Sequence, residues 1–231
     1  MTEPINSLQL LKNSLARLVW FQIGLWVLIF GFRGQLFYWQ GWLTWLITFL
    51  IFGFMTVDLA KHDPKLLERR RQTGVRFESR PLQKIVIGAS GVLTFALFAL
   101  SALDQRFHWL NTPPMESTIG LILFILGSWL VVTTFRQNTY AASTIRTEAL
   151  QQVCCSGVYS HVRHPMYAGA IVMLFGWPLM MGSYLGVLIS VFYFPLIAVR
   201  TVDEENLLRA ELEGYAEYCS KVKYRIIPRL W

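Results

Sequence analysis

Charged side chains are scarce in this sequence: only 15% of its 231 residues are Asp, Glu, Lys or Arg, whereas 54% are hydrophobic. A soluble domain carries charge on about a quarter of its residues. Cysteine is also scarce, since Cys154, Cys155 and Cys219 are too few and too unevenly spaced for a disulfide framework or a metal-binding motif. The sequence has no HExxH, GxGxxG or GxxxxGK motif. These absences argue against a disulfide-stapled secreted domain and a glycine-rich phosphate loop, and we expect no metal site.

The sequence contains several long apolar runs. Four of them approach or reach the roughly 20 residues that a helix needs to cross a bilayer, namely residues 18–32, 36–57, 85–103 and 117–135. A fifth run, residues 166–199, contains no charged side chain and is too long for one span, and Gly182-Ser183 near its middle predicts a tight turn. Five such runs together disfavour the alternative of buried helices in a soluble core. We therefore predict an all-α polytopic membrane protein with about six transmembrane helices, of which the last two form a short helical hairpin.

The basic residues predict the orientation of these spans. The net charge is +7, and with six spans every basic-rich segment falls on one side, the segment 58–84 above all. Arg33 and Arg106 are the two basic residues on the other side. Because cytoplasmic loops carry the excess of Lys and Arg, we expect both termini on the cytoplasmic side. The positive charge thus indicates a lipid bilayer as partner and not nucleic acid.

Two polar segments flank the predicted hairpin, residues 136–164 before it and 200–231 after it. The hairpin brings their near ends together and so predicts a composite site at the cytoplasmic interface. Pro165 suits the first turn of a helix, whose free amides attract anions. We therefore divide the chain into a four-helix transmembrane region with a basic cytoplasmic loop at 58–84, residues 1–135, and a catalytic region, residues 136–231.

An apolar stripe follows the second polar segment. Its members recur at steps of four and three residues, as on one face of an amphipathic helix: Leu208, Leu212, Tyr215, Cys219 and Val222. We expect a C-terminal amphipathic helix that lies on the membrane interface and covers the site.

Four short motifs carry a family resemblance: GVY at 157–159, RHPMY at 163–167, RTVDEE at 200–205 and YAEY at 215–218. Together they resemble the isoprenylcysteine carboxyl methyltransferase family, and the related phospholipid N-methyltransferases share much of the pattern. The first four spans match this family only in hydropathy. The resemblance implies S-adenosylmethionine as cofactor, bound by Gln151, Gln152, Val153, Cys154, Tyr159, His164, Pro165, Met166, Tyr167 and Glu204.

We expect Arg200, Glu204 and Glu205 to be the catalytic residues, and the resemblance implies that Arg200 binds the substrate. The expected reaction is carboxyl O-methylation of an isoprenylcysteine-type carboxylate, a lipophilic acceptor that is already deprotonated at neutral pH. N-methylation of a phospholipid amine is an alternative, in which Glu205 would serve as the base and Arg200 would hold the phosphate. S-methylation of a small thiol is another. The sequence specifies no oligomeric state.

Two further classes compete with a methyltransferase. Membrane sterol reductases, which use NADPH, also carry an Arg-His-Pro-x-Tyr segment and a Tyr-Arg-Ile-x-Pro tail like residues 224–228. Met166 stands where those proteins usually have Asn, and the Glu204-Glu205 pair favours a methyltransferase. A non-enzymatic scaffold or transporter is the other alternative, but a transporter would need polar groups within its spans, where only scattered Gln and Thr occur.

Overall fold

The computed structural model describes residues 7–141, 144, 145, 147 and 151–231. Within these residues it is built of helices and turns without a strand, which confirms the all-α prediction. The α-helices are α1 (Ser7–Arg33), α2 (Trp39–His62), α3 (Pro64–Arg71), α4 (Pro81–Phe107), α5 (Met115–Gln137), α6 (Pro165–Met180), α7 (Tyr184–Val191), α8 (Tyr193–Glu211) and α9 (Tyr215–Lys221). Two short 3₁₀ helices, η1 (Val75–Phe77) and η2 (Gly157–Ser160), lie in the connecting segments.

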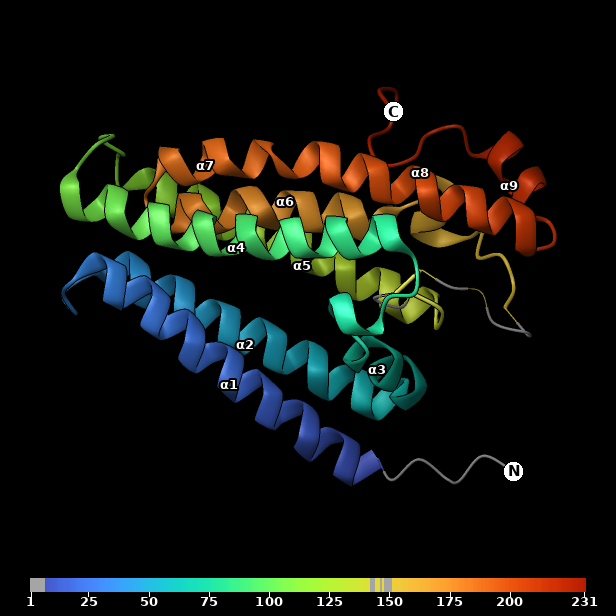
Figure 1. Cartoon of the computed structure of the whole chain (residues 1–231), viewed down its shortest axis with the longest axis horizontal. Coiled ribbons are helices and arrows are strands. Elements are labelled where there is room, and N and C mark those ends of the chain that lie inside the picture. Colours follow the sequence, from blue (N-terminus) through green and yellow to red (C-terminus); the bar gives the residue numbers. More distant parts are fainter. Residues whose placement is uncertain (1–6, 142–143, 146, 148–150) are drawn as a thin grey trace.

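The chain passes along the bundle six times. Five segments in the described part of the chain are long and apolar enough to cross a membrane: α1, α2, α4, α5 and the combined stretch Tyr184–Glu211 of α7 and α8. The sixth, α6, is apolar but shorter. Figure 1 shows that the turns after α1, α4 and α6 gather at one end of the bundle. The start of α1, α3, η2 and α9 gather at the other end, and this end is called the site end below.

The predicted turn in the uncharged run is present. Gly182 has a φ of 69°, which an L side chain rarely adopts, and Ser183 follows it as the N-cap of α7. The Ser183 hydroxyl accepts a hydrogen bond from Gly186 N and donates one to Asp104 at 2.6 Å. α7 and α8 meet at Phe192, three residues before Pro195. Proline has no N–H for the helical bond to residue 191, which explains the break.

Two expectations about the hairpin need correction. The second limb is longer than predicted, because α8 continues to Glu211 and carries Arg200, Glu204 and Glu205 on one rigid helix. The apolar stripe after it is not one helix, since α8 ends before Gly214, whose φ is 79°, and α9 begins at Tyr215. The stripe still forms one cluster, in which Tyr215, Tyr218 and Val222 pack against Val153, Leu208, Leu212 and Cys219.

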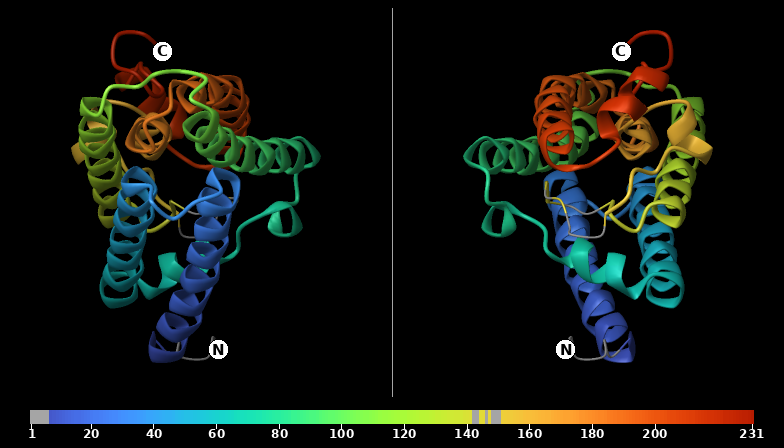
Figure 2. Two further views of the ribbon diagram at one scale, coloured as in Figure 1. Left: turned by 90° about the vertical axis from the view of Figure 1, so that its left-hand side faces the viewer. Right: turned by 90° about the vertical axis from the view of Figure 1, so that its right-hand side faces the viewer.

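Helices α5 and α6 pack with their backbones close together. A Cβ at Gly176 would lie 2.8 Å from Phe124 N, and one at Gly169 would lie 2.7 Å from Gly127 O. These spacings leave no room for a side chain larger than hydrogen. The first helix of the hairpin is therefore fixed on α5, whereas α1 slopes away from these helices toward the site end (Figures 1 and 2).

We expect Gly176→Ala to lower the thermal unfolding midpoint in detergent, because the added methyl forces α5 and α6 apart at a cost of about 1–3 kcal/mol. Gly91→Ala on α4 is the matched control, since a Cβ there would meet nothing within 4 Å. Equal unfolding midpoints for the two variants would contradict the close packing of α5 and α6.

Candidate active site

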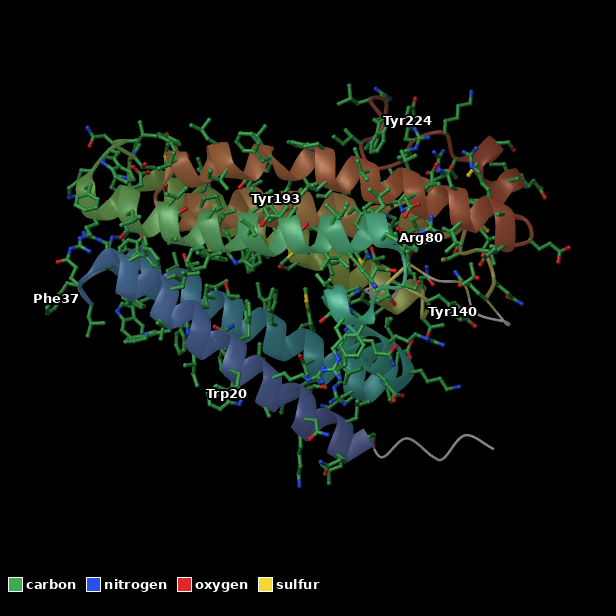
Figure 3. The ribbon with its side chains drawn as sticks, viewed as in Figure 1. Trp20, Phe37, Arg80, Tyr140, Tyr193 and Tyr224 are labelled. Carbon is green, nitrogen blue, oxygen red and sulfur yellow. The ribbon has the colours of Figure 1, made fainter. Side chains whose placement is uncertain are left out.

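A pocket opens at the site end, where the segments on both sides of the hairpin meet. Figure 3 shows Tyr140, which lines this pocket, at the opposite end of the bundle from Phe37. The ten residues that the sequence associates with a cofactor all line it: Gln151, Gln152, Val153, Cys154, Tyr159, His164, Pro165, Met166, Tyr167 and Glu204. Its free volume is about 80 Å³. Small-molecule sites are typically about 300–1,000 Å³, so a nucleoside-sized ligand requires the lining to move apart.

A buried ion pair holds the pocket together from behind. Arg163 and Glu205 are 6% and 2% exposed, and Arg163 Nε donates to Glu205 Oε1 at 2.6 Å. Arg163 Nη1 also donates to the carbonyl oxygens of Val222 and Lys223 at 2.7 and 2.9 Å. The second Glu205 oxygen accepts from Arg163 Nη2 at 3.2 Å and from Arg225 Nε at 3.1 Å. One carboxylate thus ties together the segment before α6, α8 and the segment after α9.

The segment after α9 also pairs with the Arg-His-Pro motif through its backbone. Arg163 N donates to Tyr224 O at 3.0 Å, and His164 N donates to Arg225 O at 2.8 Å. These bonds explain why a Tyr-Arg dipeptide lies near the Arg-His-Pro motif in space although about sixty residues separate them in sequence.

Glu205 does not line the pocket, so the expectation that it acts as a catalytic base does not fit this geometry. Its oxygens accept hydrogen bonds from Arg163 and Arg225, and Arg209 Nη2 lies 3.6 Å from Oε2. His164 Nε2 lies 3.3 Å from Oε1. Accepting a proton would leave the buried Arg163 guanidinium without its anion. Glu205 therefore lies in the ion-pair network behind the pocket.

Tyr167 forms the polar wall of the pocket together with Glu204. The Tyr167 hydroxyl donates to Glu204 Oε2 at 2.6 Å and accepts from Arg200 Nε at 3.0 Å. The His164 ring stacks on Tyr167 with centroids 5.5 Å apart. Arg200 and Glu204 lie on one face of α8, as their four-residue spacing predicts.

Arg200 lies behind Tyr167 and is not among the residues that line the pocket. Its Nη1 donates to Gln83 Oε1 at 3.1 Å, and Gln83 Nε2 donates to Asp203 at 2.6 Å. Asp203 in turn pairs with Arg80, which begins the turn into α4. Sequence analysis missed Gln83 and Asp203. Gln83 is fully buried in the first turn of α4, whereas its sequence neighbour Lys84 is exposed, so no signal in the local sequence singled out Gln83.

Tyrosines from η2 and α9 form the opposite wall. The Tyr218 hydroxyl donates to Tyr159 O at 2.7 Å, and Asn138 Nδ2 donates to the Tyr159 hydroxyl at 2.9 Å. Burial raises the pKa of Tyr159 and of Tyr218, so both phenols stay neutral. Burial also raises the pKa of the Cys154 thiol, which favours its protonated form at the pocket edge.

Two hydroxyls in the pocket lining have unused hydrogen-bonding capacity. Within the described part of the chain, Tyr215 Oη and Thr144 Oγ1 are buried and have no hydrogen-bond partner. Buried polar groups without a partner are uncommon in folded proteins. These two hydroxyls, the Glu204 carboxylate and the aromatic walls therefore suit a polar ligand that carries a positive charge.

A second cavity lies on the other side of Met166 and Tyr167, which line both cavities. This groove has a volume of about 510 Å³ and is formed by α1, α2, α3, α5 and α6. Most of its wall is apolar, including Phe21, Phe52 and Met173. An apolar groove separated from a polar pocket by two side chains can hold a lipophilic molecule beside a water-soluble one.

We expect Glu205→Gln to destabilise the protein by about 3–5 kcal/mol, because it leaves Arg163 charged and buried without its anion. The thermal unfolding midpoint in detergent measures this loss. Glu217→Gln is the control, because the Glu217–Lys221 pair is exposed, with 70% of each side chain accessible. A midpoint for Glu205→Gln as high as that of the control would show that the buried pair does not hold the site end together.

Parts of this chain are similar to known proteins. Residues 115–212 match the family model described as phospholipid methyltransferase. A Delta(14)-sterol reductase from Mus musculus is 37% identical over 158 residues, which cover 61% of this chain and 38% of the reductase. The chain thus spans less than two fifths of that relative's length.

The structure of the eukaryotic intramembrane Ras methyltransferase, isoprenylcysteine carboxyl methyltransferase, aligns with a TM-score of 0.47 at 21% identity. The alignment covers 80% of this chain and 67% of that protein. The region that matches the family model contains α5, the hairpin and the Arg200–Glu205 motif. Residues 115–212, less than half of the chain, are similar to the phospholipid methyltransferase family, in agreement with the resemblance in its sequence.

Proposed function

We propose that this chain is a membrane methyltransferase that uses S-adenosylmethionine to methylate a lipophilic acceptor, and that the reaction is carboxyl O-methylation of an isoprenylcysteine-type carboxylate. The observation that carries the proposal is the sharing of Met166 and Tyr167 between a polar pocket and an apolar groove. A methyl donor in the pocket and an acceptor in the groove would meet at these two side chains. The positive-inside bias favours a site that faces the cytoplasm.

The pocket residues suit the charges of S-adenosylmethionine. Glu204 can pair with the ammonium group, and the first turn of α6 at Pro165 favours the carboxylate. The rings of Tyr159 and Tyr167 can face the sulfonium through cation–π attraction. When bound, this cofactor supplies an electrophilic methyl group and leaves as a neutral thioether.

Tyr167 and Arg200 would align the acceptor. The Arg200 guanidinium polarises the Tyr167 hydroxyl, which can rotate from Glu204 toward an anionic oxygen in the groove. The site then acts chiefly by placing the acceptor oxygen in line with the methyl group, and such placement contributes several kcal/mol to lowering the barrier. Exclusion of water also favours a reaction in which opposite charges cancel.

The position of Glu205 favours a carboxylate over an amine as acceptor. An amine must lose a proton before it reacts, whereas a carboxylate requires no base. Glu205 is held by two arginines, which leaves Glu204 as the carboxylate among the described pocket residues. N-methylation of a phospholipid or S-methylation of a small thiol would require Glu204 to bind the cofactor and accept a proton.

A reductase is the second candidate, and the identity to the sterol reductase favours it. NADPH carries several phosphate charges, which proteins usually bind with arginine or lysine. Among the described residues of the pocket lining, Arg163 is the one such cation, and it is paired with Glu205. This charge pattern suits S-adenosylmethionine better than a dinucleotide.

Calorimetry in detergent tests the cofactor directly. We expect S-adenosylhomocysteine to bind, and Glu204→Gln to weaken the binding by about tenfold because an ionic contact worth about 1.4 kcal/mol is lost. NADPH should not bind. Binding of NADPH in place of S-adenosylhomocysteine would select the reductase.

Tyr167→Phe tests the alignment role, since it removes the hydroxyl that links Arg200 to Glu204. We expect S-adenosylhomocysteine binding to be largely retained and labelled methyl transfer into a lipid extract to fall by about 10²-fold. Tyr184→Phe is the control, because Tyr184 bonds to Glu116 at the other end of the bundle. Full activity of Tyr167→Phe would contradict the proposed role.

A further inference from the structure

The groove has one polar end. Its walls are apolar beside α1, α2 and α6, at Phe21, Phe52, Met55, Ala170 and Met173. At the polar end, three arginines from α1 and α3 line it: Arg17, Arg70 and Arg71. A cavity with an apolar wall and a cationic end matches an amphiphile that carries a negative charge.

Arg17 and Arg71 lie close together. Arg17 Nη1 donates to the backbone oxygen of Arg71 at 2.9 Å. In the part of the chain that the structure describes, Arg71 Nε is buried without a hydrogen-bond partner. Burial lowers the pKa of Arg71, and the positive charge of Arg17 lowers it further. An anion between the two guanidinium groups would relieve this repulsion and accept the unused N–H.

Arg70 extends the positive charge toward the pocket. It lies over the Phe135 ring at 4.2 Å, and its Nη1 donates to Ala141 O at 2.8 Å. The same nitrogen lies 3.4 Å from Met166 Sδ, at the wall between the groove and the pocket. Burial lowers the pKa of Arg70 to about 10, so its guanidinium remains charged at neutral pH.

We propose that the groove binds the methyl acceptor as a long-chain carboxylate, with its carboxylate at Arg17 and Arg71 and its chain along Phe21, Phe52 and Met173. The proposal rests on the proposed function and changes one part of it. The acceptor's charge is recognised by arginines of the first 135 residues, whereas Arg200 acts from behind Tyr167. Arg70, whose Nη1 lies 3.4 Å from Met166 Sδ, extends the positive charge from this site to the wall of the pocket.

A fluorescent long-chain fatty acid and its methyl ester test this site, because they differ only in the negative charge. The probes are titrated into the full chain in non-ionic detergent, and binding is followed by fluorescence anisotropy. We expect the acid to bind about tenfold more tightly than the ester. Arg17→Gln should remove this preference and leave binding of the ester unchanged.

Matched variants distinguish binding in the groove from a general effect of positive charge and from misfolding. Arg76→Gln removes the same charge from an exposed position in η1, after α3, and should keep the preference. Arg71→Gln should also reduce the preference for the acid. Arg71→Lys keeps the charge and should retain part of this preference, and it replaces Arg71→Gln if that variant does not fold. Met55→Trp narrows the groove and should weaken the acid and the ester alike.

Several results would overturn the proposal. One is equal binding of the acid and the ester to the unmodified chain. Another is an equal effect of Arg17→Gln and Arg76→Gln on the preference for the acid. A third is displacement of the probe when the protein concentration is raised. The last result would assign the groove to a second copy of the chain. S-adenosylhomocysteine binding is measured on the same samples. If it persists while the preference for the acid is missing, only the arginine site is wrong, and if it is absent, the proposed function fails.

Discussion

The buried ion pair between Arg163 and Glu205 is the interaction on which the site end depends. Removing two charges from water is costly unless each is fully hydrogen-bonded. Here the guanidinium group bonds to the carboxylate and to two backbone oxygens of the segment after α9. The pair therefore forms only when the Arg-His-Pro motif, α8 and that segment are all in place. The pocket walls formed by His164 and Tyr218 are consequences of the same docking.

The hairpin also provides the wall between the pocket and the groove. Its uncharged run forms α6 and the apolar part of the next limb, whose far turn is capped by Ser183. Glycines fix α6 against α5, so its first turn has a defined position. That turn carries Met166 and Tyr167, which separate the polar pocket from the apolar groove. The proposed function requires a water-soluble donor and a lipophilic acceptor to come together, and these two side chains mark where they would meet.

Much of this arrangement could be predicted from the sequence because hydropathy and spacing encode it locally. The spans, the turn at Gly182-Ser183 and the shared face of Arg200 and Glu204 follow from patterns within a few tens of residues. Other contacts could not be predicted, because they join residues far apart in the chain. These are the ion pair of Arg163 and the links of Gln83 to Arg200 and Asp203. The positive-inside pattern accounts for the basic residues near 70 but does not indicate that Arg70 and Arg71 also line the groove. The break at Gly214 was missed because the apolar periodicity continues through it.

The central claim is that a methyl group passes from the pocket to an acceptor in the groove. The most direct test is transfer of a labelled methyl group from S-adenosylmethionine into a lipid extract by the protein in bilayer nanodiscs, followed by mild base. Release of the label by base is the predicted result, because an ester is hydrolysed under these conditions. A base-stable label would assign the acceptor to nitrogen or sulfur, and no transfer by a protein that binds NADPH would contradict the account.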